Sequence, residues 1–134
     1  MSDIAEFVQS GAAKVAPKTL EELMRELPLW KSEFAQIHTP RFPHLVRQLE
    51  FLADLVEDVY DGAYKELPYA ALAAAVFALL YAKQEADLIP DWTGEMGRAD
   101  DSSVVRAVLI LHEKALMRYA EWRRIPWNRI STKP

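Results

Sequence analysis

Four aspartates gather between two strongly apolar segments of the chain. Asp87 and Asp91 flank the tripeptide Leu-Ile-Pro, and Asp100 and Asp101 follow shortly after Gly97. Carboxylate oxygens are the ligands that Mg²⁺ and Ca²⁺ prefer, and paired carboxylates can also act as general acid and base. Two carboxylates about 5 Å apart repel each other by roughly 3 kcal/mol at an effective dielectric constant near 20. The pattern therefore indicates a divalent-ion site, a hydrolytic centre or a set of helix caps.

Helix capping explains the same acids with fewer requirements. Pro90 and Gly97 prevent one continuous helix through residues 85–101, so we expect a helix–loop–helix joint there. Asp100 or Asp101 is predicted as the N-cap of the next helix, where a carboxylate meets unpaired N–H groups and the positive end of the helix dipole. The first two aspartates can cap the turn around the proline in the same way. No EF-hand spacing, HExxH motif or histidine pair accompanies them, so capping is the leading interpretation.

The other reactive residue types form no catalytic constellation. The chain has no cysteine, which excludes disulfides, thiolate metal sites and a cysteine nucleophile and suits a reducing cytosol. His112 lies on the apolar face of a predicted helix and is expected to be a hydrogen-bonded core or boundary residue. His38 and His44 lack the spacing of a zinc motif and are expected at the surface. Ser102 and Ser103 have no nucleophile elbow around them. We therefore predict no catalytic residue.

The apolar spacing is helical almost throughout and predicts an all-α protein. A chain of 134 residues with 51% hydrophobic content is typical of one globular domain, here residues 1–134. Thr19-Leu-Glu-Glu22 reads as a capping box, and the helix that it starts is expected to bend or restart at Pro28. Gly62 is the expected C′ residue of a helix that begins at Thr39-Pro40. The predicted helices are residues 3–15, 19–37, 40–61, 68–84 and 102–124, followed by an irregular basic tail, 125–134.

The alanine-rich segment 68–84 is predicted to be the centre of the bundle. It is apolar nearly all round, so a helix there has to be covered on every side. Its alanines present little side chain, which lets neighbouring helices approach closely. The apolar run Tyr69–Ala82 is roughly 21 Å long as a helix, which is short for a hydrocarbon core of about 30 Å. We therefore expect a bundle of about five helices wrapped around this segment, and no membrane span.

The end of the chain differs from the rest in charge. Six of the 16 Lys and Arg residues lie from Lys114 onward with Glu121 as the one acid, although the chain as a whole carries −4. This basic segment could contact an anionic membrane surface or an acidic protein partner. It could equally pair with the acidic side of residues 50–61 in the same molecule or in a second copy. The acidic bulk of the chain argues against nucleic acid. The candidate contact residues are Arg118, Trp122, Arg123, Arg124, Trp127 and Arg129.

Three stretches of the sequence together resemble the YkvA-like domain family of unknown function. They are an apolar helix that ends in Tyr81, the run Asp87-Leu-Ile-Pro-Asp91-Trp92, and Gly97-Arg-Ala-Asp100-Asp101. The family pattern is a helix ending in Tyr, then Pro-x-Asp-Leu-Ile-Pro-Asp-Phe-x-Pro, then Gly-x-x-Asp-Asp. The matching core covers about residues 68–110. Glu85 and Gly94 stand where the family has prolines, so the chain is a divergent member of the pattern.

The resemblance implies a small bacterial protein with no enzymatic activity that can be carried over. Some members of the family are thought to be membrane-associated. The resemblance marks Asp87, Asp91, Asp100 and Asp101 as the signature acids; Pro90, Trp92 and Gly97 complete the joint between the two helices as its loop and hinge residues.

The expected function is therefore that of a non-enzymatic helical interaction or accessory module. It would act in the cytoplasm or at the periphery of the inner membrane, through its basic aromatic C-terminal end. The alternative is a protein that binds a divalent metal, or a hydrolytic protein, that uses the four aspartates. No cofactor is expected beyond Mg²⁺ or Ca²⁺ in that alternative.

An ion titration separates the two interpretations of the aspartates. A cation that binds only the native state raises the melting temperature. If the aspartates are caps, millimolar Mg²⁺, Ca²⁺ or Mn²⁺ leaves the melting temperature unchanged, which is the result we expect. A rise that disappears in Asp100→Asn/Asp101→Asn would establish the ion site.

Overall fold

The computed structural model describes the backbone of residues 3–36, 44–88 and 98–130, and the side chains of 4–36, 44–83 and 102–130. Over these ranges the chain is helical and contains no strand, which confirms the predicted all-α bundle. The helices are α1 (Asp3–Ala13), α2 (Pro17–Ala35), α3 (Leu45–Tyr60), α4 (Tyr69–Leu88), α5 (Arg98–Leu111), α6 (Glu113–Trp122) and α7 (Trp127–Ile130).

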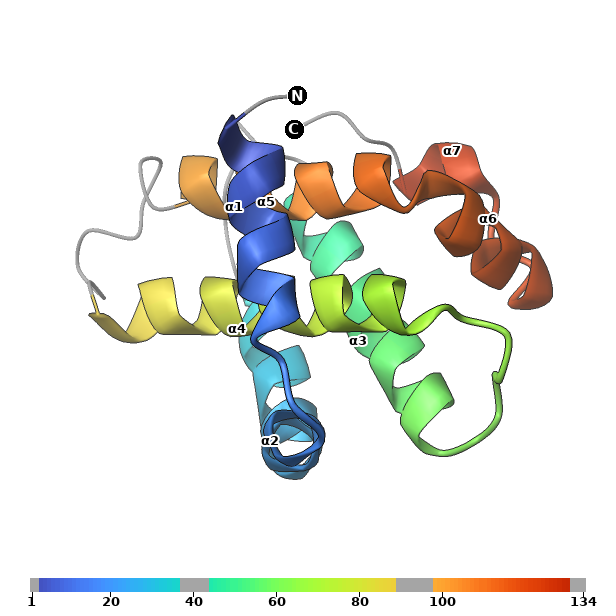
Figure 1. The fold of residues 1–134 in the computed structure, drawn as a ribbon, viewed down its shortest axis with the longest axis horizontal. Helices are drawn as coiled ribbons and strands as arrows, with labels where there is room; N and C mark the ends of the chain where they lie inside the picture. The colour runs from blue at the N-terminus through green and yellow to red at the C-terminus, as the bar shows by residue number, and fades with distance from the viewer. Residues whose placement is uncertain (1–2, 37–43, 89–97, 131–134) are drawn as a thin grey trace.

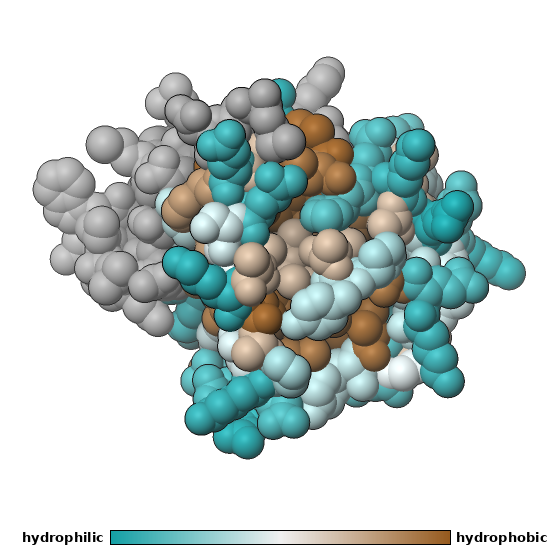
Figure 2. Space-filling view, viewed as in Figure 1, coloured by the Kyte–Doolittle hydropathy of each residue, from teal (hydrophilic) through white to brown (hydrophobic). Residues whose placement is uncertain are grey.

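Helix α4 is the centre of the bundle, as its composition predicts. It packs against α1, α2, α3 and α5, and α1 crosses both α4 and α5 on one face of the molecule (Figure 1). Apolar residues gather where α1 makes this crossing, with polar residues around them (Figure 2). The buried alanines of the central helix are Ala71, Ala73, Ala74, Ala75, Ala78 and Ala82.

The crossing of α1 over α4 depends on a glycine. A Cβ atom placed on Gly11 would lie 2.2 Å from Cε1 of Phe77, which is closer than nonbonded atoms can approach. Gly11 therefore leaves room on α1 for the ring of Phe77 from α4, and a side chain at this position would displace that ring. Ala5 and Val8 on the same helix are buried and complete its contact with the core.

Helix α2 differs from the prediction at its start and in its middle. It begins at Pro17, and Thr19 is its third residue and not its N-cap. The Thr19 hydroxyl reaches back to accept the backbone N–H of Ala16 at 3.4 Å. The helix also runs through Pro28 without restarting. Pro28 is exposed, so its ring faces solvent. The apolar residues before and after it along the helix are buried, and their burial outweighs the backbone hydrogen bond that the proline cannot make. This buried stripe is Leu23, Leu27, Trp30 and Phe34.

Ion pairs attach the second half of α2 to α3. Nζ of Lys31 lies 2.6 Å from a carboxylate oxygen of both Asp54 and Glu57. Burial alone would lower the pKa of Lys31, but the hydrogen bonds and charges of the two carboxylates raise it overall. Lys31 therefore stays charged and neutralises part of the acidic side of α3.

Helix α3 begins at Leu45 and not at Pro40 as predicted, with His44 as its N-cap. Thr39-Pro40 lies outside the described residues. The end of the helix follows the prediction, since Asp61 is the C-cap and Gly62 has φ 80°. That left-handed conformation is the one that favours glycine after a helix.

The predicted last helix is two helices, and the predicted irregular tail is partly helical. The break lies at His112, which has φ −117° and ψ 28°. The break allows α6 to run in a direction different from α5, so that Leu116 and Tyr119 are buried in the core. The turn α7 then docks on the bundle, because Ile130 is buried and its carbonyl accepts Nε2–H of Gln48 at 3.2 Å. No helix in the described part of the chain is both long enough and apolar enough to cross a bilayer.

Overpacking the central helix should destabilise the whole bundle. Ala75 is fully buried on α4, whereas Ala70 on the same helix is exposed. We expect Ala75→Leu to lower the free energy of unfolding by about 1–3 kcal/mol, and Ala70→Leu to change it by less than about 0.5 kcal/mol. Urea denaturation of the two variants measures the difference. Equal effects would show that α4 is not the closely packed centre.

Candidate functional site

The basic C-terminal segment is anchored to α3 through Tyr119. The buried phenol donates a hydrogen bond to Oδ2 of Asp58 at 2.6 Å. Nη1 of Arg123 donates to the same carboxylate oxygen at 3.0 Å and to the Tyr119 hydroxyl oxygen at 3.2 Å. It also lies 3.9 Å from Oδ2 of Asp54. One predicted alternative is that the basic end pairs with the acidic side of residues 50–61 in the same molecule. Arg123 forms this pairing.

The protonation states of Tyr119 and Arg123 match their hydrogen bonds to Asp58. Burial, followed by the hydrogen bond to Asp58, raises the pKa of Tyr119 far above its ordinary value, so the phenol stays protonated and remains a donor. The hydrogen bond with Tyr119 raises the pKa of Arg123, so the guanidinium stays charged. The carboxylate between them accepts from both groups, which makes both hydrogen bonds charge-assisted.

Aromatic rings surround the anchor. Tyr64, in the segment between α3 and α4, lies 5.2 Å from the ring of Tyr119 and 5.1 Å from that of Trp122. On the other side Phe51 lies 5.4 Å from Tyr119 and 6.0 Å from Trp127. Trp127 is half-buried by this packing, but Trp122 remains 48% exposed.

Helices α6 and α7 and the turn between them carry exposed cations. Lys114, Arg118, Arg124 and Arg129 are all exposed, and within the described ranges none of them forms a salt bridge. Met117 and Trp122 are exposed on the same helix. We name this group the α6–α7 surface; its members are Lys114, Met117, Arg118, Trp122, Arg124 and Arg129.

Arg124 holds a strained backbone position on this surface. Its φ is 59°, and no other non-glycine residue in the described ranges has a positive φ. Arg124 N–H donates to the carbonyl of Glu121 at 3.0 Å, and Ile125 N–H donates to that of Ala120 at 2.8 Å. These two bonds are the Schellman arrangement, in which glycine is the usual residue at this position. A left-handed arginine costs roughly 1–2 kcal/mol.

Three of the signature aspartates, Asp87, Asp100 and Asp101, belong to the end of α4 and the start of α5. The end of α4 and the start of α5 lie on the same side of the molecule, opposite α6 and α7 (Figure 1). Asp100 and Asp101 are in the first turn of α5, which begins at Arg98, so the prediction that one of them is the N-cap is wrong. Arginine and alanine favour helix, which extends α5 ahead of the acids. In the first turn both acids still face the favourable end of the dipole.

Asp87 is also in a helix and not in the predicted turn. It lies in the last turn of α4, where a negative charge is disfavoured by the helix dipole. Pro90, Asp91, Trp92 and Gly97 lie outside the described residues, as do the side chains of Asp87, Asp100 and Asp101. The ion site therefore stays a prediction. Among the residues whose side chains are described, no group of three or more His, Asp and Glu could hold a metal.

The histidines and serines form no reactive group in the described ranges. His112 is half-buried at the break between α5 and α6, a boundary position as predicted, and its burial lowers its pKa. His44 is half-buried and was expected at the surface, and His38 lies outside the described residues. Ser102 is buried in α5, whereas Ser103 is exposed.

Sequence reasoning did not place the aromatic support of the C-terminal end. Phe51 and Tyr64 come from elements far from α6 in the sequence, and no local spacing connects them to Trp122 or Trp127. The only local signal is the spacing of Tyr119, Trp122 and Arg123 on one helix. Comparison of the chain with protein-family models, curated proteins and solved structures finds no match. The YkvA-like resemblance therefore stays a prediction from the motif.

Replacing the strained arginine should stabilise the protein. We expect Arg124→Gly to raise the free energy of unfolding by about 0.5–1 kcal/mol. Glycine removes the cost of the left-handed conformation, but it also raises the conformational entropy of the unfolded chain, which offsets part of that gain. Arg118→Gly, in the middle of α6, should instead lower it by about 1 kcal/mol. Thermal and urea unfolding check both values. A loss of stability in Arg124→Gly would contradict the strain argument.

Proposed function

We propose that this protein is a non-enzymatic helical module of the YkvA-like type that binds reversibly to anionic membrane surfaces through the α6–α7 surface. The observation that carries the proposal is a group of four exposed cations on α6, α7 and the turn between them, none with a salt bridge in the described ranges, together with the exposed ring of Trp122 on α6. Unpaired cations next to an amphipathic aromatic ring suit the interface between lipid headgroups and acyl chains.

The charge distribution supports one orientation of the protein on such a membrane. The chain carries 20 Asp and Glu against 16 Lys and Arg, so most of its surface is repelled by anionic lipid. Among the described residues, the α6–α7 surface gathers four exposed cations that anionic lipid attracts. The membrane-facing side would therefore be the end of the bundle that carries α6 and α7, and the end of α4 and the start of α5 would lie on the other side (Figure 1).

The expected affinity is low. Each cation near an anionic membrane contributes about 1 kcal/mol, so four of them supply about 4 kcal/mol, which corresponds to a dissociation constant near the millimolar range. Partial insertion of Trp122 adds to this. Binding of this strength is reversible and sensitive to salt.

The anchor around Tyr119 supports the proposal by holding the surface in place. Arg123 is tied to Asp58 and therefore positions α6 rather than contacting a partner. Trp127 packs on Phe51 and has the same positioning role. The predicted contact residues thus divide into two groups. Arg118, Trp122 and Arg124 are exposed, and Arg129 is exposed beside a hollow that Glu50 and Asp54 of α3 also line. Arg123 and Trp127 hold the segment on α3.

Vesicle flotation tests the proposal. The wild-type protein should float with vesicles that contain phosphatidylglycerol and not with pure phosphatidylcholine, and the bound fraction should fall as salt rises. Lys114→Glu/Arg118→Glu should abolish flotation. Lys18→Glu/Arg25→Glu, which makes the same charge change at exposed positions of α2, should retain most of it.

Two results would overturn the membrane proposal. One is the absence of wild-type binding to anionic vesicles at low salt. The other is an equal loss of binding in the two charge-reversal variants, which would mean that net charge and not the α6–α7 surface decides. In that case, the remaining interpretation is that the α6–α7 surface binds an acidic protein partner.

A further inference from the structure

A concave surface lies where α1, α2 and α4 meet. The chain turns from α1 into α2 within residues 14–16, and both helices lie against α4. Between them is a hollow of about 330 Å³, at the lower end of the roughly 300–1,000 Å³ typical of ligand pockets. It is lined by Phe7, Ser10, Gly11, Lys14, Val15, Thr19, Phe77, Leu80 and Tyr81.

One side of the hollow is aromatic. The rings of Phe7, Phe77 and Tyr81 lie 5.5–6.2 Å from one another, mostly edge to face. Phe7 is 48% exposed despite these contacts. An apolar ring held half-open to water at a concave site gains free energy when an apolar ligand covers it.

Gly11 contributes to the shape of the hollow. A side chain at this position would occupy the space next to Phe77, since even a Cβ atom would lie 2.2 Å from its ring. The glycine thus makes room for the Phe77 ring, which is part of the lining of the hollow.

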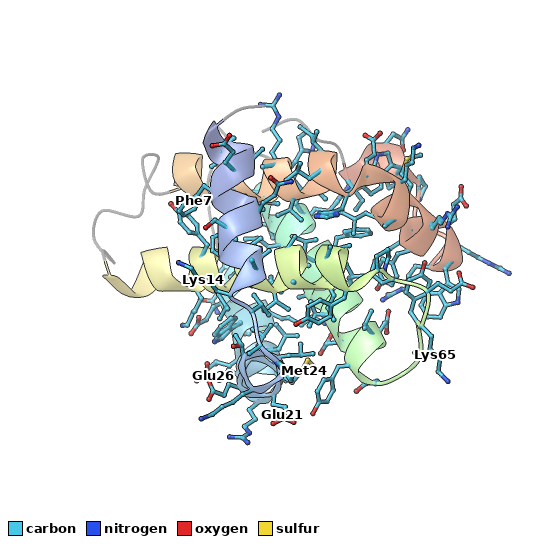
Figure 3. All side chains as sticks on the ribbon, in the orientation of Figure 1. Phe7, Lys14, Glu21, Met24, Glu26 and Lys65 are labelled. Carbon is cyan, nitrogen blue, oxygen red and sulfur yellow. The ribbon has the colours of Figure 1, made fainter. Side chains whose placement is uncertain are left out.

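The polar lining of the hollow has one sign of charge. Lys14 is a cation without a salt bridge in the described ranges, and no carboxylate lines the hollow. Figure 3 shows Lys14 and Phe7 projecting from the same side of α1. Thr19 lies in the first turn of α2, where the helix dipole favours an anion. Its hydroxyl oxygen accepts from Ala16, which leaves the hydroxyl proton available for donation.

We infer that this hollow binds an amphipathic carboxylate, a short- to medium-chain fatty acid. The acyl chain lies on Phe7, Phe77 and Tyr81, and the carboxylate meets the Lys14 ammonium and the Thr19 hydroxyl. The charge complementarity selects the anion, and the aromatic wall selects an apolar body. This site is separate from the α6–α7 surface and needs no vesicle.

Calorimetric titration with octanoate in the absence of lipid tests the inference. We expect saturable binding with a dissociation constant of roughly 0.1–1 mM for a ligand of this size. 1-Octanol, with the same chain and no charge, should bind about tenfold more weakly, and octyltrimethylammonium should not bind detectably, because Lys14 repels it.

Two variants locate the site. Lys14→Met should weaken octanoate about tenfold, the loss expected for one exposed charge-assisted contact, and leave 1-octanol unchanged. Lys18→Met removes a neighbouring exposed lysine that does not line the hollow and should change neither. Phe7→Ala, at a half-exposed position that the fold tolerates, should weaken both ligands.

The inference is overturned if octanoate shows no saturable binding, if 1-octanol binds as tightly as octanoate, or if Lys14→Met and Lys18→Met behave alike. Circular dichroism of each variant confirms that the fold is retained. Vesicle flotation of Lys14→Met should match the wild type, so the outcome here and the outcome for the membrane surface can be told apart.

Discussion

The bundle depends on the burial of α4. The alanine-rich part of α4 is apolar nearly all round, so it is stable only when other helices cover it. Helices α1, α2, α3 and α5 all pack against it. Small side chains make this possible at short range, and Gly11 extends the same requirement to α1 at the crossing with Phe77. Because a burial of this kind is closely packed, an added methylene group at the centre forces several helices to move at once.

The two ends of this core carry the features of functional interest. At one end the last turn of α4 carries Asp87 and the first turn of α5 carries Asp100 and Asp101. At the other end α6 and α7 carry exposed cations that form no salt bridge among the described residues. The second end stays in place because Tyr119, Asp58 and Arg123 form a closed set of charge-assisted hydrogen bonds under an aromatic cover. This anchor pairs Arg123 with the acidic side of α3 and leaves the other cations of α6 and α7 exposed. The proposed membrane contact therefore has a defined position on the bundle.

The hollow at α1, α2 and α4 follows from the same packing. Since α1 has to cross α4 closely, the aromatic residues beside the crossing cannot all be covered, and Phe7 remains half-exposed. The turn into α2 brings Lys14 and Thr19 to its rim. The hollow is therefore built from α1, α2 and the turn between them, which are adjacent in sequence, and from α4, which is distant in sequence.

The sequence by itself determined the helical class, the central position of the alanine-rich segment, the glycine end of α3 and the joint that reverses the chain after α4. These depend on periodicity and composition, which are local properties. Tertiary structure decided where local signals competed with packing. Helix α2 continues through Pro28 because its buried stripe spans the proline. The predicted last helix breaks at His112 so that Leu116 and Tyr119 reach the core. Only the fold could decide which basic residues face outward, because the partners of Arg123 and Trp127 lie on α3, far away in sequence.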